Sequence, residues 1–235
     1  MQLCIAALIV AVCTAAGTDV PVASFTTHNF AARDVIEVAT SAVVDRKIPG
    51  VVLMSGTAQQ RNSTAEEQDA AIFFNASVGR FTYDSSAARV DQESLYDLAS
   101  LTKVTLCTTS FALLFQSGLA HLDTRVSDPS LLGPSFSAHG KNVITVRQLL
   151  THTAGFPPDP EPGYLFPEFG CPEAQQFFPR QSFSCVRKIL QHLCENQTLA
   201  HTPGSRYVYS DLSMITLMFV VGRIVQRHGL VDQEK

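Results

Sequence analysis

The chain has 235 residues, 46% of them hydrophobic and 16% charged, and it contains no tryptophan. A chain this apolar can bury enough surface to offset the entropy of ordering, which excludes an intrinsically disordered protein. Its 13 glycines and 12 prolines follow no period, which excludes collagen-like and low-complexity classes. The net charge of −4, without a dense basic run, argues against a nucleic-acid partner.

Residues 1–17 are predicted to be a signal peptide. Residues 3–16 are a run of apolar and small side chains, too short to cross a bilayer, which needs about 20 residues. Ala15 and Gly17 supply the small side chains of a cleavage site, although Met1 and Gln2 add no basic residue before the run. We therefore expect a secreted or secretory-pathway protein with no membrane span in the mature chain. An uncleaved anchor and a cytosolic chain are the alternatives.

Glycosylation sequons favour the same route. Asn62, Asn75 and Asn196 each begin an Asn-x-Ser/Thr sequence, and each is predicted to lie near a surface turn.

The cysteines predict an optional cross-link and not a disulfide framework. Cys185 and Cys194 lie on one predicted helix, about 13 Å apart along its axis, and cannot pair within it. Cys171 could reach either of them, so the pairing stays open. Once Cys4 and Cys13 leave with the signal, the remaining cysteines are Cys107, Cys171, Cys185 and Cys194.

Hydrophobic periodicity predicts a helix over residues 29–44, ended by Pro49 and Gly50. Two apolar strands follow, over residues 51–55 and 71–78. The long polar segment between them indicates a hairpin with an extended connection.

After a turn-rich stretch, the strongest helix of the chain is predicted within residues 94–117, closed by Gly118. From there the sequence becomes richer in proline, glycine and phenylalanine. The remaining predicted elements are an extended loop and two helices, over residues 159–179, 184–195 and 212–226.

Ser100 and Lys103 stand one turn apart at the start of the strongest helix. A wheel at 100° per residue places both at the edge of a buried stripe formed by Val104, Cys107, Phe111, Leu114 and Phe115. Burying an ammonium is costly, so the pKa of Lys103 is expected to fall toward neutrality, which would let the amine accept the Ser100 proton. Taken alone, however, the pair is better explained as a serine cap and a lysine that reaches solvent.

Four segments together carry more information than this pair. They are residues 94–103 (SLYDLASLTK), 118–123 (GLAHLD), 144–156 (ITVRQLLTHTAGF) and 203–212 (PGSRYVYSDL). In order and spacing they resemble the serine β-lactamase-like family, in the branch of class C β-lactamases, DD-peptidases and their esterase relatives. The resemblance covers about residues 45–230. It implies an α/β (α+β) fold, with a mixed sheet flanked by helices and a helical subdomain.

The resemblance also implies roles for particular residues. Ser100 would be the acylated nucleophile, Lys103 its proton acceptor, and Tyr209 a general base or acid. Asp211 would take the substrate-binding position where the lactamases favour Asn, and its alternative is the N-cap of the following helix. Without this context Tyr209 would be a packing aromatic beside Tyr207. No cofactor is implied, and the histidines show no metal-ligand spacing.

The segment around His152 has a structural explanation that we keep. Thr145 and Gln148 are predicted to form a capping box at the start of a short helix, and Gly155 is predicted to end that helix. His152 is then expected to pack or hydrogen-bond in the turn, without a chemical role.

One part of the family pattern is not found. Its third motif, Lys-Thr-Gly or His-x-Gly on a strand that lines the site, has no match beyond Tyr209, because His228 and Gly229 follow a helix. The resemblance therefore implies that the C-terminal part of the sheet is missing and that catalysis is weak or silent. We expect residues 18–118 to form the N-terminal part of the α/β domain, and residues 119–235 a helical subdomain.

The sequence thus predicts a serine hydrolase that transfers an acyl group to Ser100 and hydrolyses a small-molecule, peptide or ester substrate. The alternatives are a non-catalytic binding or scaffold member of the same fold and a truncated, inactive product. The acyl substrate and the oligomeric state stay open.

Overall fold

The computed structural model describes residues 30–56, 72–164, 167–169 and 184–230. The expected signal peptide, Asn62 and Cys171 lie outside these residues. Contacts divide the chain into two units, Met1–Leu98 and Ala99–Lys235. The boundary falls before Ser100. The helix that follows Ser100, here called the nucleophile helix, is therefore grouped with the helical segment after it.

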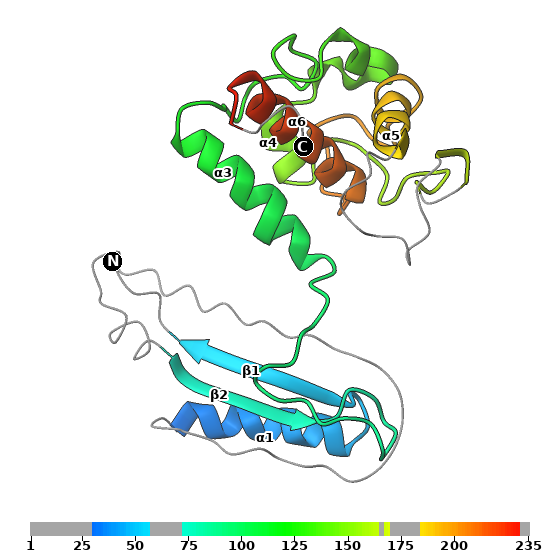
Figure 1. Cartoon of the computed structure of the whole chain (residues 1–235). Coiled ribbons are helices and arrows are strands. Elements are labelled where there is room, and N and C mark those ends of the chain that lie inside the picture. The colour runs from blue at the N-terminus through cyan, green and yellow to red at the C-terminus, as the bar shows by residue number, and fades with distance from the viewer. Residues whose placement is uncertain (1–29, 57–71, 165–166, 170–183, 231–235) are drawn as a thin grey trace. The chain divides into compact units, whose positions relative to one another are not determined.

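In the first unit a helix packs on a two-stranded hairpin (Figure 1). Helix α1 (Phe30–Val44) contacts β2 (Ile72–Gly79), which pairs antiparallel with β1 (Gly50–Gly56), as the sequence predicted. Successive side chains of a strand point to opposite faces of the sheet. Those on the face that meets α1 form a small apolar core with side chains of the helix. Its buried members are Ile36, Ala39, Val43, Val51, Leu53, Ala76 and Val78. Within the described residues the sheet has these two strands.

The two described sequons lie in different surroundings. Asn196 is exposed in the turn that follows helix α5 (Ser184–Glu195), as expected. Asn75 lies inside β2, opposite Met54, and not at a turn as predicted. Its side-chain oxygen is buried without a hydrogen-bond partner. The prediction failed because a sequon carries no information on whether its asparagine belongs to a strand.

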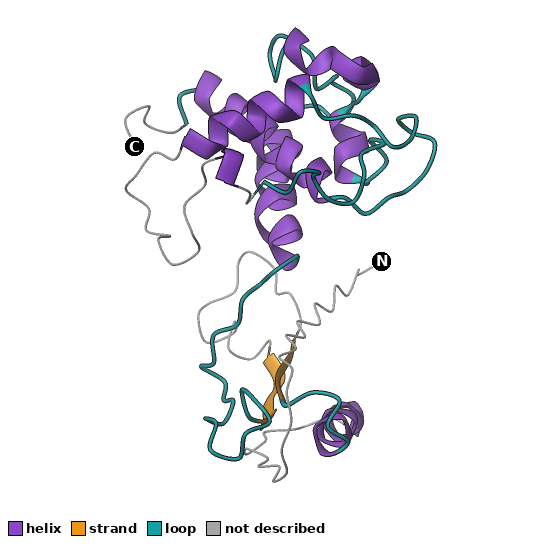
Figure 2. Cartoon of the chain, turned by 90° about the vertical axis from the view of Figure 1, so that its right-hand side faces the viewer, coloured by secondary structure: helices purple, strands orange, loops and turns teal. Residues whose placement is uncertain are grey.

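The second unit is built from helices around one apolar core (Figure 2). Helix α6 (Asp211–Arg227) contacts α4 (Val146–Leu150) and the nucleophile helix. The predicted bounds of α5 are confirmed, and those of α6 are correct to one residue at each end. Short 3₁₀ segments, η2 (Pro134–Val143) and η3 (Pro167–Phe169), complete the regular structure. Among the described helices none is long and apolar enough to cross a membrane.

The nucleophile helix begins with a π-helical segment, η1 (Lys103–Thr108), and continues as α3 (Thr109–Gln116). Threonine hydroxyls at the end of η1 and the start of α3 bond to backbone carbonyls of η1. Thr108 Oγ1 donates to Lys103 O at 3.1 Å, and Thr109 Oγ1 donates to Val104 O at 2.9 Å. Such side-chain bonds compete with the regular helical pattern. A π turn is wider than an α turn, and π segments often occur at functional sites.

This segment corrects the predicted buried stripe. Phe111 and Leu114 are buried and Cys107 is half-buried, as expected. Val104 and Phe115, however, are 60% and 49% exposed. The wheel assumed 100° for every residue, and the wider π turn breaks that spacing between Lys103 and Thr108.

The described cysteines, Cys107, Cys185 and Cys194, are free thiols. Burial raises the pKa of Cys194 and of Cys107, so both thiols stay protonated at neutral pH.

A buried lysine stands inside the second unit. Lys141 in η2 is fully buried, and its Nζ donates to the carbonyl oxygen of Gln197 at 2.7 Å. The ammonium also lies 5.7 Å from the centroid of the Phe136 ring. Burial lowers the pKa of Lys141 to about 8.

Lys141 should make the stability of the chain rise in mildly alkaline solution. Between its folded pKa of about 8 and the ordinary value of 10.5, the unfolded chain binds a proton that the folded chain does not. Over this interval we expect the free energy of unfolding to rise relative to that of Lys141→Met, by at most about 3 kcal/mol. Urea unfolding of both proteins at several pH values measures the difference. A difference that does not change with pH would contradict the assignment.

Candidate active site

The structure brings together four residues that the sequence singled out: Ser100, Lys103, Tyr209 and Asp211. All belong to the second unit. Lys103 Nζ donates to Ser100 Oγ at 3.0 Å and lies 2.7 Å from Asp211 Oδ1. It also lies 5.0 Å from the centroid of the Tyr209 ring. The start of the nucleophile helix and the start of α6 therefore converge on one ammonium group.

The nucleophile position follows a strained residue. Ala99 has a φ of 41°, in the left-handed region that residues with a Cβ rarely adopt. Backbone strain of this kind is concentrated at functional sites. The N–H groups of Thr102 and Lys103 donate to the carbonyls of Ala99 and Ser100. These two donors of the first turn are therefore engaged within the helix. Ser100 itself is exposed.

The charge of Lys103 differs from the expectation. Its side chain is only 15% exposed, and this burial alone would lower its pKa. Hydrogen bonds to Asp211 and Tyr209, together with the negative charge of Asp211, outweigh the burial, so the pKa of Lys103 is raised. The expectation of a nearly neutral amine was wrong, because the wheel could not show that a carboxylate would lie against it. Lys103 is an ammonium in the resting site.

Tyr209 shows the opposite shift. Hydrogen bonding to Ser100, and then to Lys103, lowers the pKa of its phenol. A cation stabilises the phenolate form, and a hydroxyl that donates to the phenolate oxygen does the same. Tyr209 is 46% exposed, so solvent can exchange its proton. The group in this site whose basic form is brought toward neutral pH is therefore the phenol and not the amine.

Asp211 is not the N-cap of α6. That position belongs to Ser210, whose Oγ accepts from the Ser213 N–H at 3.4 Å and donates to the carbonyl of Pro157 at 2.6 Å. Asp211 is the first helical residue, where a carboxylate also complements the helix dipole. Its side chain is 45% exposed, so one face meets Lys103 and the rest meets solvent.

A second segment holds the Tyr209 motif in place. Backbone bonds join residues 151–158 to residues 200–211. Gly204 N donates to Thr153 O at 2.7 Å, and Asp211 N donates to Pro158 O at 2.8 Å. Gly155 has a φ of 89°, and a Cβ there would stand 2.2 Å from the carbonyl oxygen of His201. Only glycine allows this close approach.

His152 packs and hydrogen-bonds in the turn, as expected, and its partners belong to the Tyr209 motif. It follows α4, which carries the predicted capping box of Thr145 and Gln148. The His152 ring lies 4.8 Å from that of Tyr209 and 5.9 Å from that of Tyr207. Its Nδ1 accepts from the Ser210 N–H at 3.1 Å. The available signal was its place in the 144–156 segment, but a sequence motif does not show which ring it contacts.

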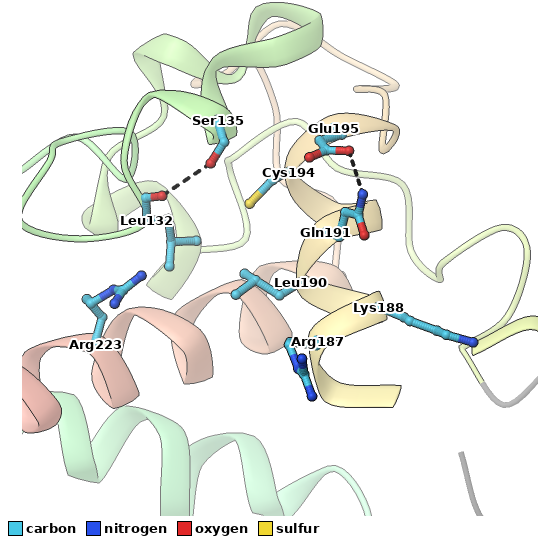
Figure 3. A pocket seen from close by; sticks show the side chains of 9 residues that line it. All are labelled: Leu132, Ser135, Arg187, Lys188, Leu190, Gln191, Cys194, Glu195 and Arg223. Atoms are coloured by element: carbon cyan, nitrogen blue, oxygen red, sulfur yellow. Dashed lines mark hydrogen bonds between the residues drawn. The ribbon is translucent and has the colours of Figure 1, made fainter. Parts of the chain in front are cut away.

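A cavity of about 480 Å³ lies elsewhere in this unit, between η2, α5 and α6 (Figure 3). Leu132, Leu190, Cys194 and Arg223 contribute to its lining. The raised pKa of Cys194 leaves a neutral thiol there and no activated nucleophile. Among the described residues, no group of three or more His, Cys, Asp or Glu side chains is placed to hold a metal ion.

Known proteins resemble this chain over the segment that contains the site. The model of the β-lactamase family matches residues 39–228, which include all four site residues. The chain belongs to the β-lactamase family. Several relatives carry the name D-alanyl-D-alanine carboxypeptidase, among them one from Escherichia coli K12 and one from Salmonella typhimurium LT2. The one from Escherichia coli K12 is 32% identical over 133 residues, and the one from Salmonella typhimurium LT2 is 30% identical over 146 residues.

These matches cover 54% and 58% of this chain but only 28% and 30% of the two relatives. This chain therefore spans less than a third of their length. A solved structure of a D-stereospecific amidohydrolase from Streptomyces superposes with a TM-score of 0.54 at 21% identity. That superposition covers 81% of this chain and 49% of the amidohydrolase. The predicted β-lactamase-like fold is confirmed.

The charge of Lys103 can be tested directly. In Asp211→Asn the carboxylate that helps to hold the proton on Lys103 is gone, so we expect the pKa of Lys103 to fall. NMR titration of ¹³Cε-labelled lysine follows this group, with Asp123→Asn as a matched control that removes a carboxylate bound to Arg147 instead. The same Lys103 titration in wild type and Asp211→Asn would show that Asp211 does not hold the charge.

Proposed function

We propose that the chain is a serine hydrolase that forms an acyl-enzyme on Ser100. The contact of one ammonium with Ser100 Oγ at 3.0 Å and with Asp211 Oδ1 at 2.7 Å, beside Tyr209, carries this proposal. Ser100 also hydrogen-bonds to Tyr209, so a nucleophile lies within reach of a base that Lys103 in turn holds, which is the arrangement of covalent catalysis. The family model and the names of the relatives support hydrolase chemistry at this general level.

The charges suggest how the roles divide. Tyr209, with its lowered pKa, accepts the proton of Ser100 as Oγ attacks the acyl carbon. The same phenol then delivers the proton to the leaving amine or alcohol. Water then attacks the acyl carbon of the ester on Ser100 and gives its proton to Tyr209. The bond between the acyl carbon and Oγ breaks, Tyr209 returns the proton to Oγ, and the carboxylic acid leaves. Lys103 stays protonated throughout and stabilises the phenolate, a role that differs from the proton acceptor that the family resemblance implies.

The substrate that donates the acyl group would be a neutral or cationic amide or ester. Asp211 adds a carboxylate to the substrate side of the site, and at an effective dielectric of about 20, two like charges about 4 Å apart repel by roughly 4 kcal/mol. Lys103 offsets part of this repulsion, and exposure of Asp211 screens more of it. A substrate that carries its own carboxylate near this position is therefore disfavoured, although by less than the unpaired figure.

Covalent labelling tests the proposed function. A fluorophosphonate should bond through phosphorus to Ser100 Oγ with loss of fluoride, the serine proton passing to Tyr209. We expect mass spectrometry to place the adduct on Ser100, and Ser100→Ala, unlike Ser205→Ala, to prevent it.

Lys103→Met should slow this labelling about a thousandfold or more, on the order of 4 kcal/mol in barrier, because the members of a catalytic unit depend on one another. Met fills a similar volume without the charge, so circular dichroism should show an intact fold. Lys188→Met removes a lysine that binds the carbonyl of Glu168, and it should label like wild type. Wild type that is folded but does not label would favour the non-catalytic binding role.

Substrate preference gives a second test. We expect slow hydrolysis of an anionic cephalosporin and faster turnover of a neutral nitrophenyl ester. Asp211→Asn should raise cephalosporin turnover about fivefold, since a partly exposed, paired charge contributes about 1 kcal/mol. Efficient cephalosporin hydrolysis that Asp211→Asn leaves unchanged would show that Asp211 does not face the substrate.

A further inference from the structure

His152 contacts the chain on both sides of Tyr209. Its carbonyl oxygen accepts from the Val208 N–H at 2.9 Å, and its Nδ1 accepts from the Ser210 N–H at 3.1 Å. The ring also lies 4.8 Å from the Tyr209 ring, so backbone and side chain of one residue fix the phenol that follows Val208. Ser210 then caps α6, which presents Asp211 to Lys103.

The Nδ1 contact depends on protonation. A backbone N–H can only donate, so Nδ1 must be the unprotonated nitrogen of a neutral imidazole. In the imidazolium both ring nitrogens donate, and the Ser210 N–H would then face another donor. The hydrogen bond with Ser210 would then be lost, and with it one of the contacts that hold the ring beside Tyr209.

We propose that His152 is a positioning residue for Tyr209 and that it positions the phenol only while its imidazole is neutral. This rests on the proposed function, in which Tyr209 moves the proton of Ser100. Neither the matching family nor the sequence motifs assign a positioning role to His152.

The groups around the ring determine where this switch would operate. Lys103 and Asp211 are the charged groups that act on it, and the phenols of Tyr207 and Tyr209 face it. Burial, and then the positive charge of Lys103, lower the pKa of His152, while Asp211 acts in the opposite direction. The neutral form therefore persists below the ordinary range of histidine, and the loss of positioning is expected in mildly acidic solution.

The left-handed backbone of His152, with a φ of 54°, allows an informative pair of variants. Asparagine tolerates this conformation and places its side-chain oxygen where Nδ1 stands, so His152→Asn keeps an acceptor that cannot be protonated. Glycine also tolerates it, so His152→Gly removes acceptor and ring without backbone strain. His121→Asn changes an exposed histidine and serves as the control.

The first measurement is NMR titration of the whole chain. In wild type we expect the Ser210 amide and the Tyr209 ring resonances to shift with one midpoint, equal to that of His152. His152→Asn should remove this midpoint, and His121→Asn should keep it. Tyr209 and Ser210 resonances that titrate alike in wild type and His152→Asn, or that ignore the His152 midpoint, would overturn the proposal.

The second measurement is the rate of fluorophosphonate labelling of Ser100 against pH. Protonation of Tyr209 should slow labelling of both wild type and His152→Asn as the pH falls. Wild type should show a further loss of reactivity below the His152 midpoint, whereas His152→Asn should lack this further loss and stay within about threefold of wild type at pH 8. His152→Gly should be slower by about tenfold or more at every pH, because small misplacements of a catalytic group are costly. The same acidic loss in wild type and His152→Asn would overturn the proposal. Absence of labelling in folded wild type would defeat the proposed function, while the NMR titration would still decide the positioning role.

Discussion

One ammonium group organises the candidate site. Lys103 lies against the nucleophile hydroxyl, a carboxylate and a phenol, and its three N–H groups suffice for all of them. The side chain is largely buried, and Asp211 and Tyr209 offset the cost of burying its charge. The position of Ser100 and the acidity of Tyr209 both depend on this balance.

The remainder of the second unit can be understood as support for that contact. The helix that carries Ser100 and the helix that begins at Asp211 share one apolar core, which fixes their ends relative to each other. The segment from Thr151 to Pro158 then holds the chain on either side of Tyr209, with Gly155 allowing the close approach. The catalytic chemistry that we propose thus depends on backbone contacts that no side-chain motif reveals.

Much of this arrangement follows from local sequence signals. The hairpin, helix α5 and the capping box of α4 were predictable because each depends on periodicity or on a short motif. The exposure of Val104 was not, because the prediction assumed a regular α-helix and the chain is π-helical at Lys103–Thr108. The charge of Lys103 and the capping role of Ser210 were missed for another reason. The charge of Lys103 depends on Asp211, a partner distant in sequence. The cap depends on which of two adjacent polar residues, Ser210 or Asp211, accepts from the helix N–H.

The central claim is that Lys103 is a permanent cation that, together with the hydrogen bond from Ser100, makes Tyr209 acidic. Its most direct test is the titration of Tyr209, labelled with ¹³C at Cζ, in wild type and in Lys103→Met. The account predicts a Tyr209 pKa below the ordinary tyrosine value in wild type, and a rise toward that value when the ammonium is removed, while the hydrogen bond with Ser100 remains. An ordinary pKa in wild type, or the same pKa in both proteins, would contradict it.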